Sequence, residues 1–390
     1  MLDLDLLRPF LDDRHASVAA EAAEVAAEVA ALPAAEDDGA ARRQARELLA
    51  LFGDARLPRH AVPESWGGSP HGPDLRACCL VRDALAAASP LADSVFALQG
   101  LGSMPVVLAG SEALRRRWLP EVIAGRAMAA FAMTEPESGS DVASMSTRAI
   151  RDGSDWILEG TKHLITNAGV ADFYCVFAAT EPGAGGRGIS CFLVEADNPG
   201  LHFVGPQVLS EPHPLGEIAF SACRVPGSSL LGVPGEGFKL GMRTLDRLRP
   251  TVAAAACGMA SRALREALGY AASRRQFGAP MSDLQMTQQK LARMATDLAA
   301  SRLLTYRAAF EADRGAERIT LEAAMAKGFS TEAAQRVVDD AVQILGGRGV
   351  LAQSPVDRLY RAVRALRIYE GATEVQHLVI ARQLLRRSEV

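Results

Sequence analysis

The residue most able to do chemistry in this chain is Glu370, in the tripeptide Tyr369-Glu370-Gly371 near the C-terminus. Apolar residues precede it, Arg367 is the only charged residue among those neighbours, and a helix-breaking glycine follows it. A carboxyl group in apolar surroundings can hold its pKa near neutral, which a general base requires. The fragment taken alone is also compatible with an ordinary glutamate at the end of a helix.

A second candidate segment covers residues 131–141 and reads FAMTEPESGSD. An apolar strand is expected to end at Thr134, and Pro136 and Gly139 then favour an exposed turn. Such a turn presents backbone N–H groups and hydroxyls to a flat polar ligand or to a phosphate. Composition alone allows a second interpretation, in which the segment is the polar entry to a hairpin.

The composition limits the class of protein. The chain has 390 residues, of which 49% are hydrophobic, and this is enough for two or three domains with large cores. A net charge of -4 gives no reason to expect nucleic acid or an anionic membrane as a partner. The six cysteines form no CxxC pair, and the seven histidines show no metal-binding spacing. We therefore expect buried free thiols, a reducing compartment and no metal site.

The ends and apolar runs of the sequence predict location. The acidic, leucine-rich N-terminus lacks the features of a signal or transit peptide. We expect no segment long and apolar enough to cross a bilayer. These features predict a cytoplasmic protein.

Hydrophobic periodicity divides the chain into three blocks. Residues 1–128 read as an all-helical domain, because the apolar positions have helical spacing and strand-forming residues are scarce. Residues 129–238 read as a β-domain, with short strands near 156–158, 173–177 and 189–194 and Gly-rich turns between them. Residues 239–390 return to long helical runs with few breakers. The spacing of the strands predicts a small sandwich or barrel in the middle block.

The candidate segments resemble signatures of one known family. Residues 131–141 are similar to the flavin-binding signature of the acyl-CoA dehydrogenases, with its T-E-P-x-x-G-S-D core. The stretches 343–349 (QILGGRG) and 368–371 (IYEG) are similar to the family's C-terminal signature. The resemblance implies a mainly α fold with a β-domain insert: an N-terminal helical domain, a middle β-barrel or sandwich, and a C-terminal four-helix bundle. It also implies FAD, held between the β-domain and the bundle.

The resemblance assigns cofactor roles to particular positions. Thr134 matches a hydroxyl contact to the flavin edge, and Arg274 matches an arginine that meets the FAD pyrophosphate of a neighbouring subunit. An arginine suits that role because its planar fork can bind phosphate through two hydrogen bonds. The positions that match cofactor contacts are Phe131, Met133, Thr134, Gly139, Ser140, Leu164, Thr166, Arg274, Gln276, Phe277, Gln285, Gln343, Gly346, Gly347, Thr373 and Glu374.

Other matching positions concern the substrate and the base. Those that resemble substrate contacts are Ser140, Asp246, Arg249 and Gly371. Asp246 and Arg249 match a D-x-x-R motif, although their spacing also suits a helix-surface ion pair. Some family members carry the catalytic acid at the position of Leu248, so Glu370 is the one candidate base in this pattern.

The chain departs from the family pattern at three places. Leu164 stands where an aromatic residue is common, and leucine can fill that space without stacking on a ring. Ala362 replaces an aspartate beside two arginines, and Ala372 replaces a threonine. The first departure bears on the reactivity of the flavin, and the last on the strength of cofactor binding.

The leading functional hypothesis is FAD-dependent α,β-dehydrogenation of an acyl-CoA, with Glu370 abstracting the α-proton. The alternative is a dehydrogenase or oxidase that acts on a thioester bound to an acyl carrier protein. A flavin oxidase or monooxygenase on the same scaffold and a catalytically silent helical scaffold are two further hypotheses. The resemblance also implies fatty acid metabolism, electron-transfer flavoprotein as electron acceptor, and a homotetramer or dimer that shares its FAD sites.

Overall fold

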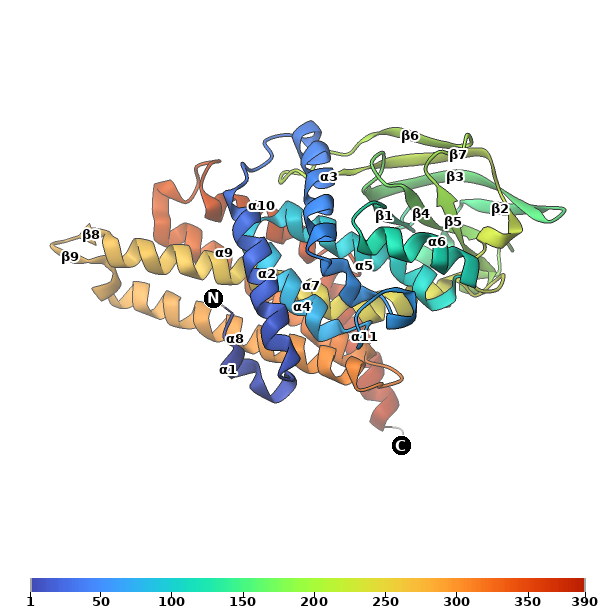
Figure 1. Cartoon of the computed structure of the whole chain (residues 1–390). Helices are drawn as coiled ribbons and strands as arrows, with labels where there is room; N and C mark the ends of the chain where they lie inside the picture. The colour runs from blue at the N-terminus through green and yellow to red at the C-terminus, as the bar shows by residue number, and fades with distance from the viewer. Residues whose placement is uncertain (1, 389–390) are drawn as a thin grey trace. The chain divides into compact units, whose positions relative to one another are not determined.

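The computed structural model describes residues 2–388, and Figure 1 shows the arrangement of its helices and strands. Contacts within the chain define two compact units. Unit 1 combines the chain up to Leu32, the segment Leu75–Asp93 and the chain from Arg249 onward. Unit 2 combines Pro33–Asp74 with Ser94–Leu248. The predicted boundaries after residues 128 and 238 stay a prediction.

Among the described residues, unit 2 holds a seven-stranded sheet in the order β1-β4-β2-β3-β7-β6, with β5 paired to β4. β1 and β4 are parallel, while β4–β5, β2–β3, β3–β7 and β6–β7 are antiparallel. The sheet curls, and the pair Arg148–Ala179 joins β2 to β4. The strands are β1 (Ala129–Ala132), β2 (Arg148–Asp152), β3 (Asp155–Thr166), β4 (Phe173–Ala179), β5 (Ile189–Glu195), β6 (Leu201–Pro206) and β7 (Leu215–Val225). The predicted middle β-domain is therefore confirmed.

Strand β4 shows why this sheet is buried on both faces. All seven of its residues are buried. Since alternate side chains point to opposite faces, Tyr174 and Val176 belong to one apolar cluster and Phe173 and Phe177 to another. The ring of Trp118, on helix α6 (Glu112–Ile123), lies 4.7 Å from that of Phe173. The continuous apolar run at 173–179 is thus explained by a core on each side of the strand.

Unit 2 also contains the helices α3 (Asp38–Asp54) and α6 (Glu112–Ile123). Each begins at a side-chain cap, since Asp37 accepts from the backbone N–H of Ala40 at 2.7 Å and Ser111 accepts from that of Leu114 at 3.3 Å. These caps satisfy N–H groups that the first turn of a helix leaves without a partner.

Helix α5 (Pro90–Ala109) corrects one sequence-based expectation. By length and composition, α5 is the one helix among the described residues that could cross a membrane. Its most apolar window has a mean hydropathy of 1.4. The expectation that no segment would do so was wrong. In the structure 72% of that window is buried, which is typical of a core helix. Length and composition alone do not separate the two kinds of helix.

Unit 1 is helical and contains the C-terminal region. Its described helices include α1 (Leu4–Leu7), α2 (Arg14–Ala31), α4 (Leu75–Ala88), α8 (Gln285–Asp313), α9 (Thr320–Leu345), α10 (Pro355–Leu366) and α11 (Thr373–Ser388). The long helix α7 (Gly237–Ser273) contributes its residues from Arg249 onward. Helix α9 packs against α8, α10 and α11. A cluster of Ala, Val, Leu and Met side chains from α7 to α10 forms the core, and it confirms the predicted C-terminal helices.

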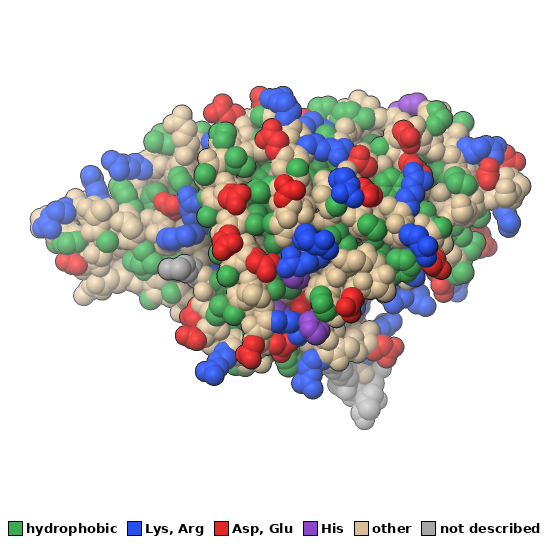
Figure 2. Space-filling model, viewed as in Figure 1, with side chains coloured by type: hydrophobic (Ala, Val, Ile, Leu, Met, Phe, Trp, Pro, Cys, Tyr) green, Lys and Arg blue, Asp and Glu red, His purple; other side chains and the backbone are tan. Residues whose placement is uncertain are grey.

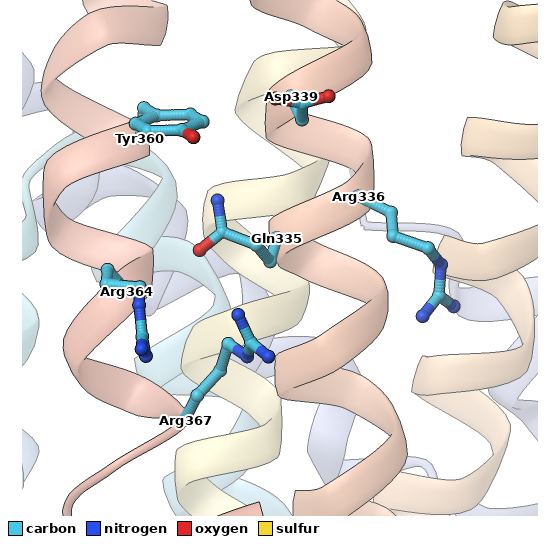
Figure 3. A pocket seen from close by; sticks show the side chains of 6 residues that line it. All are labelled: Gln335, Arg336, Asp339, Tyr360, Arg364 and Arg367. Atoms are coloured by element: carbon cyan, nitrogen blue, oxygen red, sulfur yellow. The ribbon is translucent and has the colours of Figure 1, made fainter.

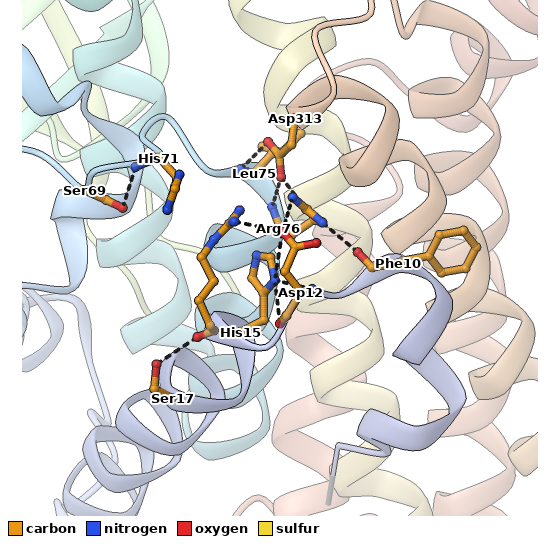
Figure 4. A network of polar contacts seen from close by, with 10 residues as sticks. Phe10, Asp12, His15, Ser17, Ser69, His71, Leu75, Arg76 and Asp313 are labelled. Atoms are coloured by element: carbon orange, nitrogen blue, oxygen red, sulfur yellow. Dashed lines mark hydrogen bonds and ion pairs between the residues drawn. The ribbon is translucent and has the colours of Figure 1, made fainter.

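An ion network centred on the buried Arg76 connects the N-terminal segment to the rest of unit 1 (Figure 4). Arg76, on α4, donates to the carboxylate of Asp313 at 2.8 Å and to that of Asp12 at 3.0 Å. It also donates to the backbone carbonyl of Phe10 at 3.0 Å. One guanidinium thereby joins the start of the chain, helix α4 and the end of α8, and these contacts hold the pKa of Asp12 below its ordinary value.

The cysteines and the surface charges agree with the composition. All six cysteines lie within the described part of the chain, and each is buried and free, as predicted. On the face drawn in Figure 2, acidic and basic side chains are interspersed. Exposed pairs such as Arg126–Glu121, at 2.6 Å, contribute little to stability.

Candidate active site

Glu370 lies in the short turn between α10 and α11, and its backbone is in the left-handed region with φ +53°. The next residue, Gly371, has φ +96°. A non-glycine residue in this region is uncommon and costs about 1–3 kcal/mol, so it persists where the surroundings determine the backbone. The turn therefore needs external support.

Three side chains supply that support by donating to the carbonyl oxygens of the turn. The Arg249 Nε donates to the carbonyl of Glu370 at 3.0 Å. The Lys327 Nζ donates to the carbonyl of Gly371 at 2.7 Å, and the Gln376 Nε2 donates to the same oxygen at 2.9 Å. Arg249, Lys327 and Gln376 are all buried, and they come from α7, α9 and α11. The backbone at Glu370 is thus fixed by three helices.

The side chain of Glu370 is in an unusual electrostatic position. Its Oε2 atom is buried and has no hydrogen-bond partner among the described residues. Burial raises the pKa of Glu370 above its ordinary value, although the nearby cations Arg82, Arg249 and Lys327 oppose the shift and Asp93 adds to it. Such a carboxylate can accept a proton more readily than a solvated one, which is what the sequence predicted for a base.

The burial of Lys327 makes the free energy of unfolding depend on pH. It is fully buried, and burial lowers the pKa of Lys327 from 10.5 to about 8. Between these values the unfolded chain binds the proton and the folded chain does not. The free energy of unfolding should therefore rise with pH across this window by about 3 kcal/mol from this group.

Lys327→Met is expected to abolish that contribution and to leave the protein at least as stable as the wild type at pH 7. Urea unfolding at pH 7 and pH 9.5 measures both effects. Lys239→Met, which removes an exposed lysine, is the control and should leave the pH dependence unchanged. If Lys327→Met kept the pH dependence of the wild type, burial would not lower the pKa of Lys327.

The predicted flavin-binding residues of unit 2 lie where β1 and β3 end. The backbone N–H of His163 donates to the carbonyl of Thr134 at 2.9 Å, so these two segments are adjacent. Leu164 has φ +55° and is 50% exposed, and its N–H donates to the side chain of Gln207 at 2.7 Å. Thr166 ends β3. The structure thus brings Thr134, Leu164 and Thr166 to one edge, together with Phe131 on β1 and the buried Met133 that follows it.

This edge fits a flat ring with a polar rim. Leu164 offers exposed apolar surface, and Thr134 and Thr166 are partly exposed and carry hydroxyls. Gly139 and Ser140 are exposed, and a Cβ at Gly139 would meet nothing within 4 Å. Open backbone and hydroxyls of this kind can contact a phosphate. The side chains present therefore suit a flavin nucleotide.

A buried ion pair lies directly behind this edge. The Lys162 Nζ donates to Glu135 at 2.8 Å and to the carbonyl of Met133 at 3.0 Å. Glu135 also accepts from the backbone N–H of Ser146 at 2.6 Å and of Thr147 at 3.0 Å. These donors overcome the effect of burial and lower the pKa of Glu135 to about 2, while burial lowers the pKa of Lys162 to about 8. The pair fixes the backbone of the predicted flavin segment.

A further set of predicted cofactor residues lies elsewhere in unit 1. Strands β8 (Arg275–Gln276) and β9 (Ala279–Pro280) form a hairpin after α7 that projects from the helices (Figure 1). Its tip residue Phe277 is 94% exposed. The set is exposed and consists of Arg274, Gln276, Phe277, Gln285, Gln343, Gly346 and Gly347. Since α9 rises 1.5 Å per residue, Gln343 is roughly 24 Å along the helix from Lys327 and hence from the Glu370 turn.

The remaining predicted site residues, Asp246, Thr373 and Glu374, lie on two different helices. Asp246 is partly buried on α7. Glu374 is exposed on α11, and Thr373 begins that helix and is 8% exposed. The hydroxyl of Thr373 donates to Glu332 at 2.7 Å, so its proton is engaged within the chain. The cofactor roles predicted for Thr373 and Glu374 stay predictions.

Comparison with known proteins decides the family. Residues 12–126, 130–223 and 235–385 match the models of the N-terminal, middle and C-terminal domains of acyl-CoA dehydrogenase. The chain belongs to the acyl-CoA dehydrogenase family. It is 42% identical over 356 residues to the probable acyl-CoA dehydrogenase FadE25 of Mycobacterium tuberculosis. This alignment covers 90% of each chain.

Solved structures agree with this membership. Butyryl-CoA dehydrogenase from Megasphaera elsdenii aligns with a TM-score of 0.89 at 32% identity, covering 96% of this chain and 99% of that one. The prolyl acyl carrier protein oxidase AnaB aligns with a TM-score of 0.87 at 26% identity, with 96% and 99% coverage. The resemblance and fold expected from the sequence are confirmed, and this acyl-CoA dehydrogenase is an oxidoreductase of a flavoprotein family.

Several residues around the site of this acyl-CoA dehydrogenase were missed by sequence reasoning. They are Arg82 and Asp93, Lys327 and Gln376, and the pair Glu135–Lys162. A signal existed for two of them, because Arg82 and Lys327 stand in apolar or alanine-rich stretches of sequence. A charged residue at such a position is seldom buried without a partner. The identity of that partner could not be read from the sequence.

A surface hollow of about 270 Å³ opens between α9 and α10 (Figure 3). Its lining residues are Gln335, Arg336, Asp339, Tyr360, Arg364 and Arg367. Arg336 pairs with Asp297 at 3.0 Å and Arg367 pairs with Glu332 at 2.8 Å. None of the predicted catalytic, cofactor or substrate residues lines this hollow, so we do not assign it to the active site.

Proposed function

We propose that this protein catalyses the α,β-dehydrogenation of an acyl-CoA thioester to the 2-enoyl-CoA, with Glu370 as the base. The observation that carries the proposal is the buried Oε2 of Glu370, which has no hydrogen-bond partner among residues 2–388, together with the burial that raises the pKa of this carboxyl group. Family membership supports the acyl-CoA substrate and the flavin. We propose FAD as that flavin, contacted by the edge at Thr134, Leu164 and Thr166.

The proposed chemistry removes one proton and one hydride. Glu370 takes the α-proton, the electrons of the broken Cα–H bond form the Cα=Cβ double bond, and the β-hydrogen leaves with its electron pair. Bound FAD would supply the acceptor for that hydride. The step leaves Glu370 protonated, and the product is the neutral enoyl thioester. A carboxylate with a raised pKa suits the proton transfer because its proton affinity is closer to that of the weakly acidic substrate.

The charge that develops on the thioester carbonyl also needs stabilisation. We propose that the backbone N–H of Glu370 donates to this oxygen, as an oxyanion-hole donor does. The turn favours such a role because Arg249, Lys327 and Gln376 hold its carbonyl oxygens. A fixed donor requires no reorganisation when the charge develops.

The exposed residues of the β8–β9 hairpin support a shared cofactor site. A separation of roughly 24 Å along α9 between Gln343 and the Glu370 turn argues against one compact site for both sets. We propose that Arg274, Gln276 and Phe277 contact FAD bound by a neighbouring subunit, so that the active form is a homotetramer or dimer. An almost fully exposed Phe277 is consistent with burial by a partner.

An acyl carrier protein is the alternative to CoA as the carrier of the acyl group. AnaB, described as a prolyl acyl carrier protein oxidase, is a more distant relative than the acyl-CoA dehydrogenases compared above. We therefore propose CoA as the carrier, a role in fatty acid metabolism in the cytoplasm, and electron-transfer flavoprotein as the electron acceptor.

When the holoenzyme is mixed anaerobically with a panel of acyl-CoA thioesters, at least one acyl group is expected to bleach the absorbance of the oxidised flavin. The same acyl groups on an acyl carrier protein should react more slowly. Faster bleaching by the carrier-bound thioesters would favour the alternative. Oxygen consumption without an added acceptor would indicate an oxidase, and no bleaching with either carrier would refute dehydrogenation.

A further inference from the structure

One carboxylate on α9 joins the two ends of the Glu370 turn. The Oε1 atom of Glu332 accepts from the Nε of Arg367 at 2.8 Å and from the hydroxyl of Thr373 at 2.7 Å. Arg367 directly follows α10, and Thr373 begins α11. Figure 3 shows the side chain of Arg367 extending from the end of α10 toward α9. Glu332, both of its donors and the turn all belong to unit 1.

The backbone closes the turn at the same two residues. The N–H of Thr373 donates to the carbonyl of Arg367 at 3.1 Å, so the ends of the segment 368–372 are in contact. Between them lie Glu370 and Gly371 with their positive φ values. Such a backbone persists only where its surroundings determine it. Glu332 therefore acts on the ends of the turn, whereas the three donors described above act on carbonyl oxygens within it.

Glu332 is a strong acceptor for both donors. Its side chain is 26% exposed. Burial acts to raise the pKa of Glu332, but the hydroxyl of Thr373 and the guanidinium of Arg367 hold it below its ordinary value. An ionised carboxylate accepts stronger hydrogen bonds than a neutral group does. Since Lys327 on the same helix donates to the carbonyl of Gly371, α9 contacts the turn both in its middle and at its ends.

We propose that Glu332 is a positioning residue for Glu370: by joining Arg367 to Thr373, it fixes the direction of the Glu370 carboxylate and of the Glu370 backbone N–H. This proposal rests on the proposed role of Glu370 as the base. Glu332 acts through the turn and takes no part in proton transfer. A displacement of about 1 Å at a reacting group can lower the rate on the order of 10²-fold, so a turn held less firmly should slow the reaction.

Two substitutions of Glu332 measure this role in the holoenzyme. Glu332→Ala removes the acceptor, and its rate of flavin bleaching at saturating thioester should fall on the order of 10²-fold. Glu332→Gln keeps an oxygen that can accept from Arg367 and Thr373, so it should restore most of the rate. The thioester concentration that gives half the maximal rate should stay within about threefold of the wild type in both, because the lost contacts serve the reaction rather than binding.

Asp297→Asn is the matched control. The carboxylate of Asp297, on α8, accepts from Arg336 on α9 at 3.0 Å, and its side chain is 17% exposed. It is likewise a partly shielded carboxylate paired with an arginine, but this pair joins α8 to α9 and not to the Glu370 turn. Asp297→Asn should leave the bleaching rate unchanged. Urea unfolding of both variants shows whether a difference in stability accompanies the difference in rate.

Hydrogen exchange of peptides that cover residues 367–376 measures the turn without turnover. Exchange should be faster in Glu332→Ala than in the wild type and unchanged in Asp297→Asn. Thr373→Val removes one of the two donors and should change exchange and bleaching in the same direction. Because Thr373 acts through Glu332, the double variant Glu332→Ala/Thr373→Val should lose no more activity than Glu332→Ala alone.

Three results would each overturn the proposal: wild-type exchange over 367–376 in Glu332→Ala, a bleaching rate that falls no further there than in Asp297→Asn, or fully additive losses in the double variant. If Glu332→Ala does not fold, wild-type exchange and bleaching in Thr373→Val would overturn it as well. Turnover retained by Glu370→Gln would instead refute the base, and hydrogen exchange would still report whether Glu332 fixes the turn.

Discussion

Glu370→Gln is expected to keep the flavin bound and to lose turnover by about 10²–10⁴-fold, the usual contribution of a general base. Glutamine has the size of glutamate but cannot take up the α-proton. The fold should tolerate the change because the Oε2 of Glu370 has no hydrogen-bond partner within the described chain and its backbone carbonyl still accepts from Arg249. Stopped-flow loss of flavin absorbance under anaerobic conditions measures the effect.

The matched control for this experiment is Glu266→Gln. Glu266 pairs with Arg262 at 2.6 Å on α7 and is an ordinary helix glutamate. Its replacement should leave the bleaching rate within a factor of two or so of the wild type, since surface ion pairs contribute little. If Glu370→Gln bleached its flavin at the wild-type rate with a good thioester, Glu370 would not be the base.

Lys162→Met should destabilise the protein by about 3–5 kcal/mol, because it leaves the carboxylate of Glu135 buried without its cation. The remaining donors to Glu135 are the backbone N–H and the hydroxyl of Ser146 and the backbone N–H of Thr147. Urea unfolding at pH 7 measures the change. The flavin should also bind more weakly, because Lys162 no longer holds the carbonyl of Met133.

The double variant Glu135→Gln/Lys162→Met is the control for buried charge. It removes both charges, and its loss of stability should be clearly smaller than that of Lys162→Met alone. Lys327→Met provides the contrast, because the Lys327 Nζ donates to a backbone carbonyl rather than to a carboxylate. Equal losses in the single and double variants at position 162 would show that packing, and not an uncompensated charge, governs stability there.

The elements of the fold were largely accessible from the sequence. The strands expected near 156–158, 173–177 and 189–194 correspond to β3, β4 and β5, and the long helical runs after 239 correspond to α7 through α11. Periodicity and turn residues act locally, so a linear reading captures them. Helix α5 shows the limit, since its apolar composition does not reveal whether protein or lipid surrounds it.

The surroundings of the candidate base were not accessible in the same way. Glu370 could be singled out by its neighbours in sequence, but Arg82, Asp93 and Lys327 come from helices distant along the chain. Their effect on the pKa of Glu370 depends on packing that brings these helices together. Likewise, Glu135 lies within the flavin-binding signature, yet its pairing with Lys162 depends on how β3 folds beside β1.

The left-handed backbone of Glu370 has an evolutionary consequence. Glycine, and to a lesser degree asparagine, adopts this conformation with less strain than glutamate does. Replacing Glu370 by glycine should therefore relieve backbone strain while it removes the proposed base, so selection for stability and selection for turnover oppose each other at this position. A glutamate is kept at position 370 where selection for turnover is stronger than selection for stability.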